Sequence, residues 1–539
     1  MGEGGSIRGE SGRRTVLRWC AAALGLVLAA GLHAGHAAAA DCAALKSAEG
    51  GDLTIDTAEM VAAGSVAEQP DLPEHCHVSG MINKRTGADG KQYGIGFNLR
   101  MPADWNGRFV FEGGGGLDGI LKLGDGSVYG SINPPALARG FAVITTDGGH
   151  RSQSNIDADF AQDQQARLDY AFNALDRVTL VGKDLVTRYY GSRPEYSYLL
   201  GCSNGGRQGL MAAERYPLHF DGIVAGDPAF KLTRIAMDQV WNIQVVASIS
   251  PKNEDGRPIL SKAFSDADLR LVADAVLKRC DALDGLADGM INDWQGCDFD
   301  PAELTCSGKK TDQCLAPKQV EALKKLHQGP VDGEGKPLYG RFPYDTGIAQ
   351  SVWRRMRMGT ATDGTWDAAD FFLGFETLRQ YSMTPPDKTF DPMTFDFDSD
   401  VARTAQMRAL GDADQTYLQT FRDHGKMIVY HGLSDQGMAT GALTDWYDAV
   451  VSDNGEGVRD SVRLFLVPGM THCGGGMSTD QFDMLSAIQA WVEEGKAPQR
   501  IIARGEAFPG ISRPLCPYPQ VARYDEGDPD KAGSFVCRN

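Results

Sequence analysis

One serine of the chain stands in the pattern Gly-x-Ser-x-Gly, at residues 201–205, and it could act as a nucleophile. In hydrolases this pattern forms a sharp turn between a strand and a helix, and the turn presents the serine hydroxyl above the edge of the sheet. The apolar residues 196–200 predict a buried strand, and residues 207–216 predict a helix. We therefore predict that Ser203 is a nucleophile of acyl transfer rather than a serine in an ordinary glycine turn.

A serine hydroxyl requires a general base, and histidine is the side chain that most often fills that role. His472 lies in a glycine-rich segment, residues 468–476, directly after the apolar run 462–467. This run predicts a strand, so His472 would stand at a carboxyl end, where parallel sheets place their sites. His424 lies just before a predicted strand, rather than after one, and His219 lies near the end of a predicted helix. We therefore predict His472 as the base.

The base in turn requires a carboxylate that orients it. Asp435 lies in the segment 431–437, directly after the apolar run 426–430, which also predicts a strand. The order Ser203, Asp435, His472 is the chain order of serine, acid and histidine in one large class of hydrolases. We predict Asp435 as the acid.

Two cysteines flank these residues. Cys202 directly precedes Ser203, and Cys473 directly follows His472. A disulfide between them would clamp the nucleophile turn to the base-bearing loop across about 270 residues of chain.

A run of four glycines, residues 113–116, follows the apolar run 108–112. Glycines let backbone N–H groups approach a developing oxyanion, and a further donor is expected from the residue after the nucleophile. We predict Gly115, then Gly114, and Asn204 as these donors. A flexible surface turn is the alternative, and a phosphate loop is disfavoured because no Gly-Lys-Ser/Thr follows.

An acidic loop forms a second constellation. Asp281, Asp284 and Asp288 lie close together among glycines, between Cys280 and Cys297, which could staple the loop. Carboxylates are the hard oxygen ligands that Ca²⁺ prefers, although the spacing is not that of an EF-hand. The alternative is a solvated acidic turn. No cluster of histidines accompanies the loop, which disfavours a metallohydrolase.

Short apolar runs alternate with helical patterns in the parts of the chain that carry these residues. The pattern predicts an α/β fold, a mainly parallel sheet with helices on both faces. Residues 231–413 differ, with cysteines, acidic loops and few clear strands. We predict a catalytic domain made of residues 41–230 and 414–539, interrupted by a lid domain at 231–413.

The N-terminus predicts export. Arg13 and Arg14 precede an apolar run at 19–32, and small residues end in four alanines at 37–40. This is the pattern of a cleaved signal, residues 1–40 here, with a twin-arginine signal as the less favoured variant. The remaining chain contains an even set of cysteines, which in an oxidising compartment predicts disulfides. They are Cys42, Cys76, Cys202, Cys280, Cys297, Cys306, Cys314, Cys473, Cys516 and Cys537.

Charge excludes some partners. The formal net charge of the 539 residues is −18, which argues against binding to nucleic acid or to an anionic membrane surface. With 42% hydrophobic and 23% charged residues the chain is ordinary globular material rather than disordered. The oligomeric state is not predicted.

Three segments resemble the signature of the tannase and feruloyl esterase family, which includes a hydrolase of mono(hydroxyethyl) terephthalate. They are G-C-S-N-G-G-R at 201–207, H-G-L-S-D at 431–435 and P-G-M-T-H-C-G-G-G at 468–476. The resemblance covers nearly the whole mature chain. It implies an α/β-hydrolase fold with a large lid and ester cleavage through an acyl-serine, with the triad and the disulfide named above.

The same resemblance implies further details. It implies a structural calcium ion in the lid, held by the side chains of Asp281, Asp284 and Asp288 and the carbonyls of Leu286 and Met290. It implies three further disulfides: Cys42–Cys76, Cys306–Cys314 and Cys516–Cys537. No organic cofactor is expected.

The preferred hypothesis is an exported serine esterase acting on feruloyl- or galloyl-type esters. A hydrolase of terephthalate monoesters is the alternative, disfavoured because Asn204 replaces the acidic residue that such an enzyme carries after its nucleophile. A secreted binding protein without catalysis is the alternative outside enzymes. It is disfavoured because all three triad positions are occupied.

Overall fold

The structure, a computed structural model, describes residues 1, 41–48, 50–127 and 133–539. Apart from its first residue, the predicted export signal at 1–40 lies outside the described residues. Within the described part of the chain, no helix is both long and apolar enough to cross a membrane.

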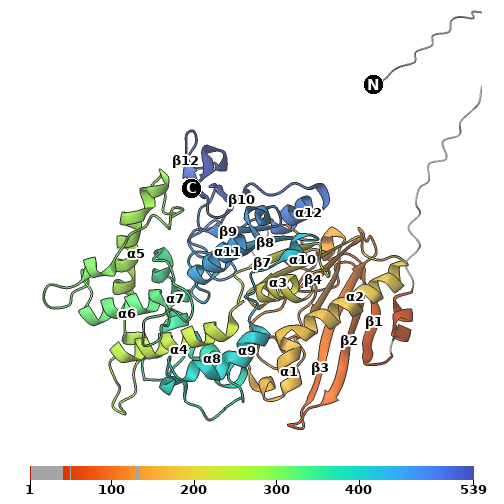
Figure 1. Cartoon of the computed structure of the whole chain (residues 1–539), viewed down its shortest axis with the longest axis horizontal. Coiled ribbons are helices and arrows are strands. Elements are labelled where there is room, and N and C mark those ends of the chain that lie inside the picture. The colour runs from red at the N-terminus through yellow and green to blue at the C-terminus, as the bar shows by residue number, and fades with distance from the viewer. Residues whose placement is uncertain (2–40, 49, 128–132) are drawn as a thin grey trace, which may run out of the picture. The chain divides into compact units, whose positions relative to one another are not determined.

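A nine-stranded sheet forms the centre of the structure (Figure 1). Its strand order is β1-β2-β3-β5-β4-β6-β7-β8-β9, and the pairs from β5 to β9 are parallel. Helices cover both faces, so the predicted α/β-hydrolase class with a mainly parallel sheet is confirmed. The strands are β1 (Leu53–Val61), β2 (His75–Thr86), β3 (Gln92–Pro102), β4 (Arg108–Glu112), β5 (Ala142–Thr146), β6 (Tyr196–Cys202), β7 (Gly222–Gly226), β8 (Lys426–Gly432) and β9 (Val462–Val467).

Alternate side chains of each parallel strand enter two different cores. Phe111 of β4 and Leu199 of β6 pack in the core beneath α2, α3 and α11, whereas Val110 and Leu200 pack in the core beneath α12. Burial on both faces explains why these strands are continuous apolar runs in the sequence. The helices are α2 (Ala174–Tyr190), α3 (Asn204–Arg215), α11 (Thr440–Asn454) and α12 (Met484–Glu494).

Strands β1, β2 and β3 extend the sheet with antiparallel pairs, an extension that the apolar runs do not predict. The disulfide Cys42–Cys76 ties the start of the described chain to β2. These strands form the end of the sheet opposite β9, so they lie away from the carboxyl ends of β8 and β9.

Residues 231–413, which we call the lid segment, form their own hydrophobic core, drawn from residues 236–401. The two ends of the segment meet, because the Ala413 N–H donates to the Phe230 carbonyl over 2.7 Å. Figure 1 shows its helices α5, α6 and α7 gathered on the side of the sheet away from β1–β3. The lid helices are α4 (Leu232–Ile249), α5 (Asp266–Cys280), α6 (Pro317–Gln328), α7 (Ser351–Arg357), α8 (Ala369–Glu376) and α9 (Ala405–Gly411).

Two small antiparallel hairpins follow α12: β10 (Ile501–Ala503) with β11 (Arg513–Leu515), and β12 (Val521–Tyr524) with β13 (Phe535–Arg538). The disulfide Cys516–Cys537 joins them. The structure pairs all ten cysteines that follow the predicted signal. The other pairs are Cys42–Cys76, Cys202–Cys473, Cys280–Cys297 and Cys306–Cys314.

Candidate active site

Ser203 occupies the turn between β6 and α3. Its backbone has φ 62° and ψ −121°, a conformation that L-residues rarely adopt outside sites where the surrounding structure imposes it. Helix α3 begins at Asn204, earlier than predicted. Gly205 and Gly206 in its first turn allow a close approach of neighbouring backbone. A Cβ atom built on Gly206 would lie 2.4 Å from the carbonyl oxygen of Gly226. The serine is partly exposed, as a nucleophile must be.

His472 and Asp435 are in direct contact. The distance from His472 Nδ1 to Asp435 Oδ2 is 2.7 Å. The other carboxylate oxygen, Oδ1, accepts the N–H groups of Gly437 and Met438 over 2.7 and 2.9 Å. Both oxygens of this buried carboxylate are thus engaged, which fixes the orientation of the imidazole ring.

In this pair each side chain stabilises the charged form of the other. Burial by itself would lower the pKa of His472, but the charge of Asp435, the hydrogen bond to it and the charge of Asp227 raise this pKa above its usual value. Burial by itself would raise the pKa of Asp435, but His472 lowers it. The pair therefore stabilises the imidazolium that forms when the histidine accepts a proton.

The predicted disulfide joins the nucleophile turn to the loop of His472. Cys202 and Cys473 are bonded, with 6.0 Å between their Cα atoms. Ser203 and His472, each adjacent to one of these cysteines, are therefore neighbours. Among the described residues no hydrogen bond joins the Ser203 hydroxyl to His472. In ligand-free enzymes such contacts are commonly long and tighten when substrate binds.

The glycine loop after β4 packs against the start of α3. A Cβ atom on Gly113 would lie 2.6 Å from the Cα atom of Gly205. However, the Gly114 N–H donates to Gln208 Oε1 over 3.0 Å, and the Gly115 N–H donates to Asp118 Oδ1 over 2.9 Å. In this structure, side chains of the protein thus accept the N–H groups of both predicted donors, Gly114 and Gly115.

Two other N–H groups at this place remain free. Those of Gly116 and Asn204 donate to no acceptor in the described part of the chain. The two residues are neighbours, because the Tyr170 hydroxyl lies 2.9 Å from the Gly116 carbonyl and 3.2 Å from Asn204 Oδ1. The start of a helix leaves N–H groups without intrahelical partners, which explains the free donor at Asn204.

Asp118 holds the glycine loop to the nucleophile helix, a role that the sequence analysis missed. Its Oδ1 accepts both the Gly115 N–H and, over 2.7 Å, the Asn204 side-chain amide. Burial raises the pKa of this carboxyl to about 6. Its place two residues after the glycine run is the one sequence signal.

The side chain of Asn204 faces this network. Its Oδ1 accepts from Arg207 Nε over 2.8 Å and from the Tyr170 hydroxyl, and its amide donates to Asp118. The residue is 1% exposed. Its side chain is therefore used within the protein, and only its backbone N–H remains for a substrate.

The lid segment contacts the loop of the acid. Asp345 accepts a hydrogen bond from the Ser434 hydroxyl, and the Tyr339 hydroxyl accepts the Ala439 N–H over 3.1 Å. A small cavity of about 20 Å³ between lid and loop is lined by Asp435 itself. The lid segment thus packs directly beside the acid of the candidate triad.

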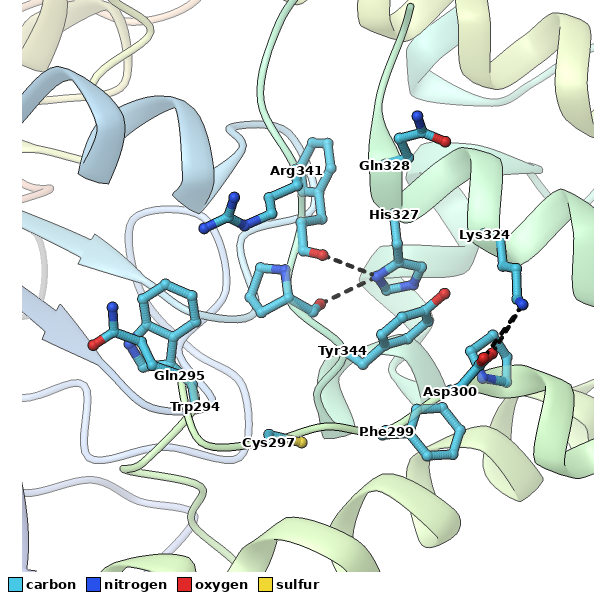
Figure 2. A pocket seen from close by; sticks show the side chains of 13 residues that line it. Trp294, Gln295, Cys297, Phe299, Asp300, Lys324, His327, Gln328, Arg341 and Tyr344 are labelled. Carbon is cyan, nitrogen blue, oxygen red and sulfur yellow. Dashed lines mark hydrogen bonds and ion pairs between the residues drawn. The ribbon is translucent and has the colours of Figure 1, made fainter. Parts of the chain in front are cut away.

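A larger cavity, of about 700 Å³, lies elsewhere in the lid segment. Figure 2 shows Trp294 and Gln295 on one side of it and His327, Tyr344 and Lys324 on the other. The His327 ring stacks on Tyr344 with 3.8 Å between centroids, and burial lowers its pKa to about 4. No residue of the candidate triad lines this cavity, so we place the chemistry at Ser203.

The acidic loop follows α5 and is closed by the disulfide Cys280–Cys297. Asp284 is buried, and burial followed by the charges of Asp288 and Asp281 raises its pKa to about 6. Asp288 forms an ion pair with Arg513. Three carboxylates with one arginine leave negative charge for a cation to balance, so the donor chemistry fits Ca²⁺.

The side chains of this loop are nevertheless not arranged as a closed cage. Among the described residues, sets of three metal-ligating side chains within 4.8 Å occur only around Asp227. Asp281 Oδ1 instead accepts the N–H groups of Asp288 and Gly289 over 3.1 and 3.0 Å. The remaining predicted ligands, the carbonyls of Leu286 and Met290, lie in the same short loop.

The arrangement supports acyl transfer. A partly exposed hydroxyl on a strained turn, a neighbouring imidazole oriented by a buried carboxylate, and a free backbone N–H group on the residue after the serine are parts that ester cleavage requires.

Comparison with known proteins gives a consistent result. A family model described as "Tannase and feruloyl esterase" matches residues 76–538. The mono(2-hydroxyethyl) terephthalate hydrolase of Piscinibacter sakaiensis is 42% identical, and the match covers 93% of this chain and 92% of that protein. A probable feruloyl esterase of Arthroderma benhamiae is 30% identical, with 81% of each chain covered.

Solved structures support the fold. The crystal structure of feruloyl esterase B from Aspergillus oryzae matches with a TM-score of 0.77 and 24% identity, covering 93% of this chain and 100% of that one. Tannin acyl hydrolase from Aspergillus niger matches with a TM-score of 0.71 and 23% identity, covering 93% and 95%.

Proposed function

This chain belongs to the tannase and feruloyl esterase family and is a carboxylic ester hydrolase, and we propose that it cleaves esters of aromatic acids through an acyl-serine. The observation that carries the proposal is the 2.7 Å contact between His472 Nδ1 and Asp435 Oδ2, beside the disulfide that brings Ser203 to the same place.

In the proposed reaction the Ser203 oxygen attacks the ester carbonyl carbon while His472 Nε2 takes the hydroxyl proton. The tetrahedral intermediate collapses as the imidazolium returns this proton to the departing alcohol, which leaves the acyl group on the serine. Water then attacks, with His472 again as base, and the carboxylic acid leaves. Asp435 stays ionised and holds the ring.

We assign the oxyanion donors to the backbone N–H groups of Asn204 and Gly116. Both lack a partner among the described residues, and Tyr170 contacts both residues. Preorganised donors of this kind stabilise the charge that develops in the transition state.

The relatives support a proposal for the substrate class. Esters of phenolic acids, of the feruloyl or galloyl type, are our first proposal, because the family model and the feruloyl esterase relative point to them. A terephthalate monoester is the second candidate, favoured by the 42% identity to the terephthalate hydrolase. Asn204 does not decide between them, because its side chain is turned into the protein.

The experiment is a Ser203→Ala variant, assayed on methyl ferulate, methyl gallate and mono(2-hydroxyethyl) terephthalate together with the parent enzyme. Loss of the nucleophile should reduce turnover by at least about a thousandfold on every substrate that the parent cleaves. A fluorophosphonate should label the parent enzyme at Ser203. A variant that keeps a tenth of the activity would exclude Ser203, and cleavage of the terephthalate ester alone would replace the first substrate proposal by the second.

We further propose that residues 231–413 act as a lid, that the loop at 281–290 binds a structural calcium ion, and that the enzyme is exported. The meeting of residues 230 and 413 supports the lid, and the buried Asp284 beside two further carboxylates supports the cation. Five disulfides support an oxidising compartment.

A further inference from the structure

Asp227 is a buried carboxylate behind the candidate triad that the mechanism above does not use. It directly follows β7, is 0% exposed, and has a φ of 34°, a backbone conformation that an L-residue rarely adopts. A conformation of this kind persists where the surrounding contacts impose it.

Both oxygens of Asp227 accept backbone N–H groups from the two loops that carry the acid and the base. Oδ1 accepts the Gly432 N–H over 2.8 Å, at the end of β8 and three residues before Asp435. Oδ2 accepts the Cys473 N–H over 3.1 Å, directly after His472.

The same carboxylate touches the nucleophile turn. Oδ2 lies 3.6 Å from Sγ of Cys202. This is a van der Waals contact rather than a hydrogen bond, because a sulfur in a disulfide carries no proton to donate. The Asp227 N–H donates to the Tyr430 carbonyl over 2.8 Å, which fixes the carboxylate against β8. One side chain therefore contacts all three segments that carry the triad.

We propose that Asp227 is a positioning residue that holds the acid-bearing and base-bearing loops in register with the nucleophile turn. The inference rests on the proposed function. It differs from the role of the disulfide, because the disulfide joins the nucleophile turn to the base loop, whereas Asp227 also connects both to the acid loop.

The charge of Asp227 adds a second effect on His472. The groups that face this pair are Asp435 from the acid loop, His431 of β8, whose Nδ1 is 3.1 Å from Asp227 Oδ1, and Arg357 of α7, which acts on Asp435. The negative charge of Asp227 raises the pKa of His472, after the larger effects of burial and of Asp435. Removing this charge should therefore lower that pKa.

The test is Asp227→Asn, a substitution that keeps the shape but removes the charge and one of the two acceptors. We expect kcat for a chromogenic ester to fall about tenfold or more with KM within twofold, because a small misplacement of catalytic groups affects turnover more than binding. The acid limb of the kcat/KM profile should move to lower pH. A residue that only supports the fold would lower the melting temperature without moving that limb.

Asp221→Asn is the matched control. Asp221 directly precedes the same strand, β7, and its Oδ2 accepts the Ser197 N–H over 2.8 Å at the opposite edge of the sheet. It is also a carboxylate that bonds to backbone, but it lies far from the candidate triad. This variant should keep kcat and the pH profile of the parent.

Fluorophosphonate labelling distinguishes failure of the proposed function from failure of the role proposed for Asp227. If the parent enzyme is not labelled at Ser203, the proposed function fails. If the parent is labelled and Asp227→Asn is labelled at the same rate with unchanged kcat, only the role of Asp227 is overturned.

Should Asp227→Asn not fold, hydrogen exchange of the parent enzyme decides. The amides of Gly432 and Cys473 should both be strongly protected, and rapid exchange at either would overturn the proposal.

Discussion

At the scale of single residues, the contact between His472 and Asp435 both orients the imidazole ring and changes the pKa of each side chain. The carboxylate is fully buried and the imidazole is only partly exposed, so each stabilises the charged form of the other against the effect of burial. Two backbone N–H groups, of Gly437 and Met438, hold the second oxygen of the buried acid.

This coupling predicts the pH dependence of the reaction. Only the neutral imidazole can accept the Ser203 proton, and Asp435 raises the pKa of His472 above the usual 6.5. The fraction of active enzyme should therefore fall as pH decreases through this raised value. The measurement is kcat/KM against pH for an ester whose leaving group does not titrate in the range. A half-maximal point at or below pH 6.5 would contradict the assignment.

The variant Asp435→Asn removes the charge of this side chain while keeping its shape. It should reduce kcat by roughly ten-thousandfold, the effect known for the equivalent change in a serine protease triad. The remaining activity should titrate at lower pH, because the asparagine no longer stabilises the imidazolium.

At the scale of elements, the disulfide Cys202–Cys473 connects the end of β6 to the loop after β9 across 271 residues. Replacing both cysteines by alanine should lower kcat markedly at temperatures where circular dichroism shows the variant folded. The reason is that His472 is adjacent to one cysteine and Ser203 to the other. Full turnover in that variant would show that other contacts alone align the two residues.

The disulfide Cys306–Cys314 provides the control. It closes a loop of 8 residues in the lid segment and touches no candidate catalytic residue. Its double alanine variant should keep the turnover of the parent enzyme, because loss of a short cross-link changes little beyond the local loop.

The strands that carry the triad could be predicted because they are buried on both faces and are therefore continuous apolar runs. β4 and β9 match the predicted ranges, and β8 extends two residues beyond its range. β7 reads Gly-Ile-Val-Ala-Gly, too short and too rich in glycine to stand out. β1 and β2 were missed because many of their side chains are only partly buried. β3 is buried along most of its length, but its sequence is interrupted by glycines and polar residues.

That the three members of the candidate triad come together could be predicted, because each follows a strand and sits in a distinctive local pattern. Asp227 and the partners of Asp118 could not, because their contacts cross long separations in sequence. The Asp227 contact to Cys473 spans 246 residues, and the Asp118 contact to Asn204 spans 86. The hydrogen bond from the Gly115 N–H to Asp118 could not be predicted either, because only the folded chain places that carboxylate at the glycine loop.

At the scale of the whole molecule, the acidic loop connects two parts of the chain that are distant in sequence. Asp288 pairs with Arg513 and Asp293 pairs with Arg523, so the loop after α5 is tied to the two C-terminal hairpins. α5 itself belongs to the core of the lid segment. A change in this loop should therefore affect the lid as a unit rather than the sheet.

The last prediction is that Ca²⁺ stabilises this junction without taking part in catalysis. A ligand that binds only the folded state stabilises it as its concentration exceeds the dissociation constant. Adding a chelator should therefore lower the melting temperature by on the order of a few °C, and excess Ca²⁺ should restore it. Asp284→Ala should lose this response. Asp298→Ala, at an exposed position of the same region that pairs only with Arg279, should keep it.

Activity assays on the same preparations should distinguish an effect of chelation on the lid from an effect on the candidate triad. Activity on a small ester, assayed well below melting, should survive chelation better than activity on a bulky phenolic ester that requires lid contacts. The candidate triad lies on the segments after β6, β8 and β9, and in the described chain no hydrogen bond or ion pair joins it to the side chains of Asp281, Asp284 or Asp288. Elemental analysis without bound calcium, together with a melting curve that responds neither to chelator nor to Ca²⁺, would show that Arg513 alone balances the charge of this loop.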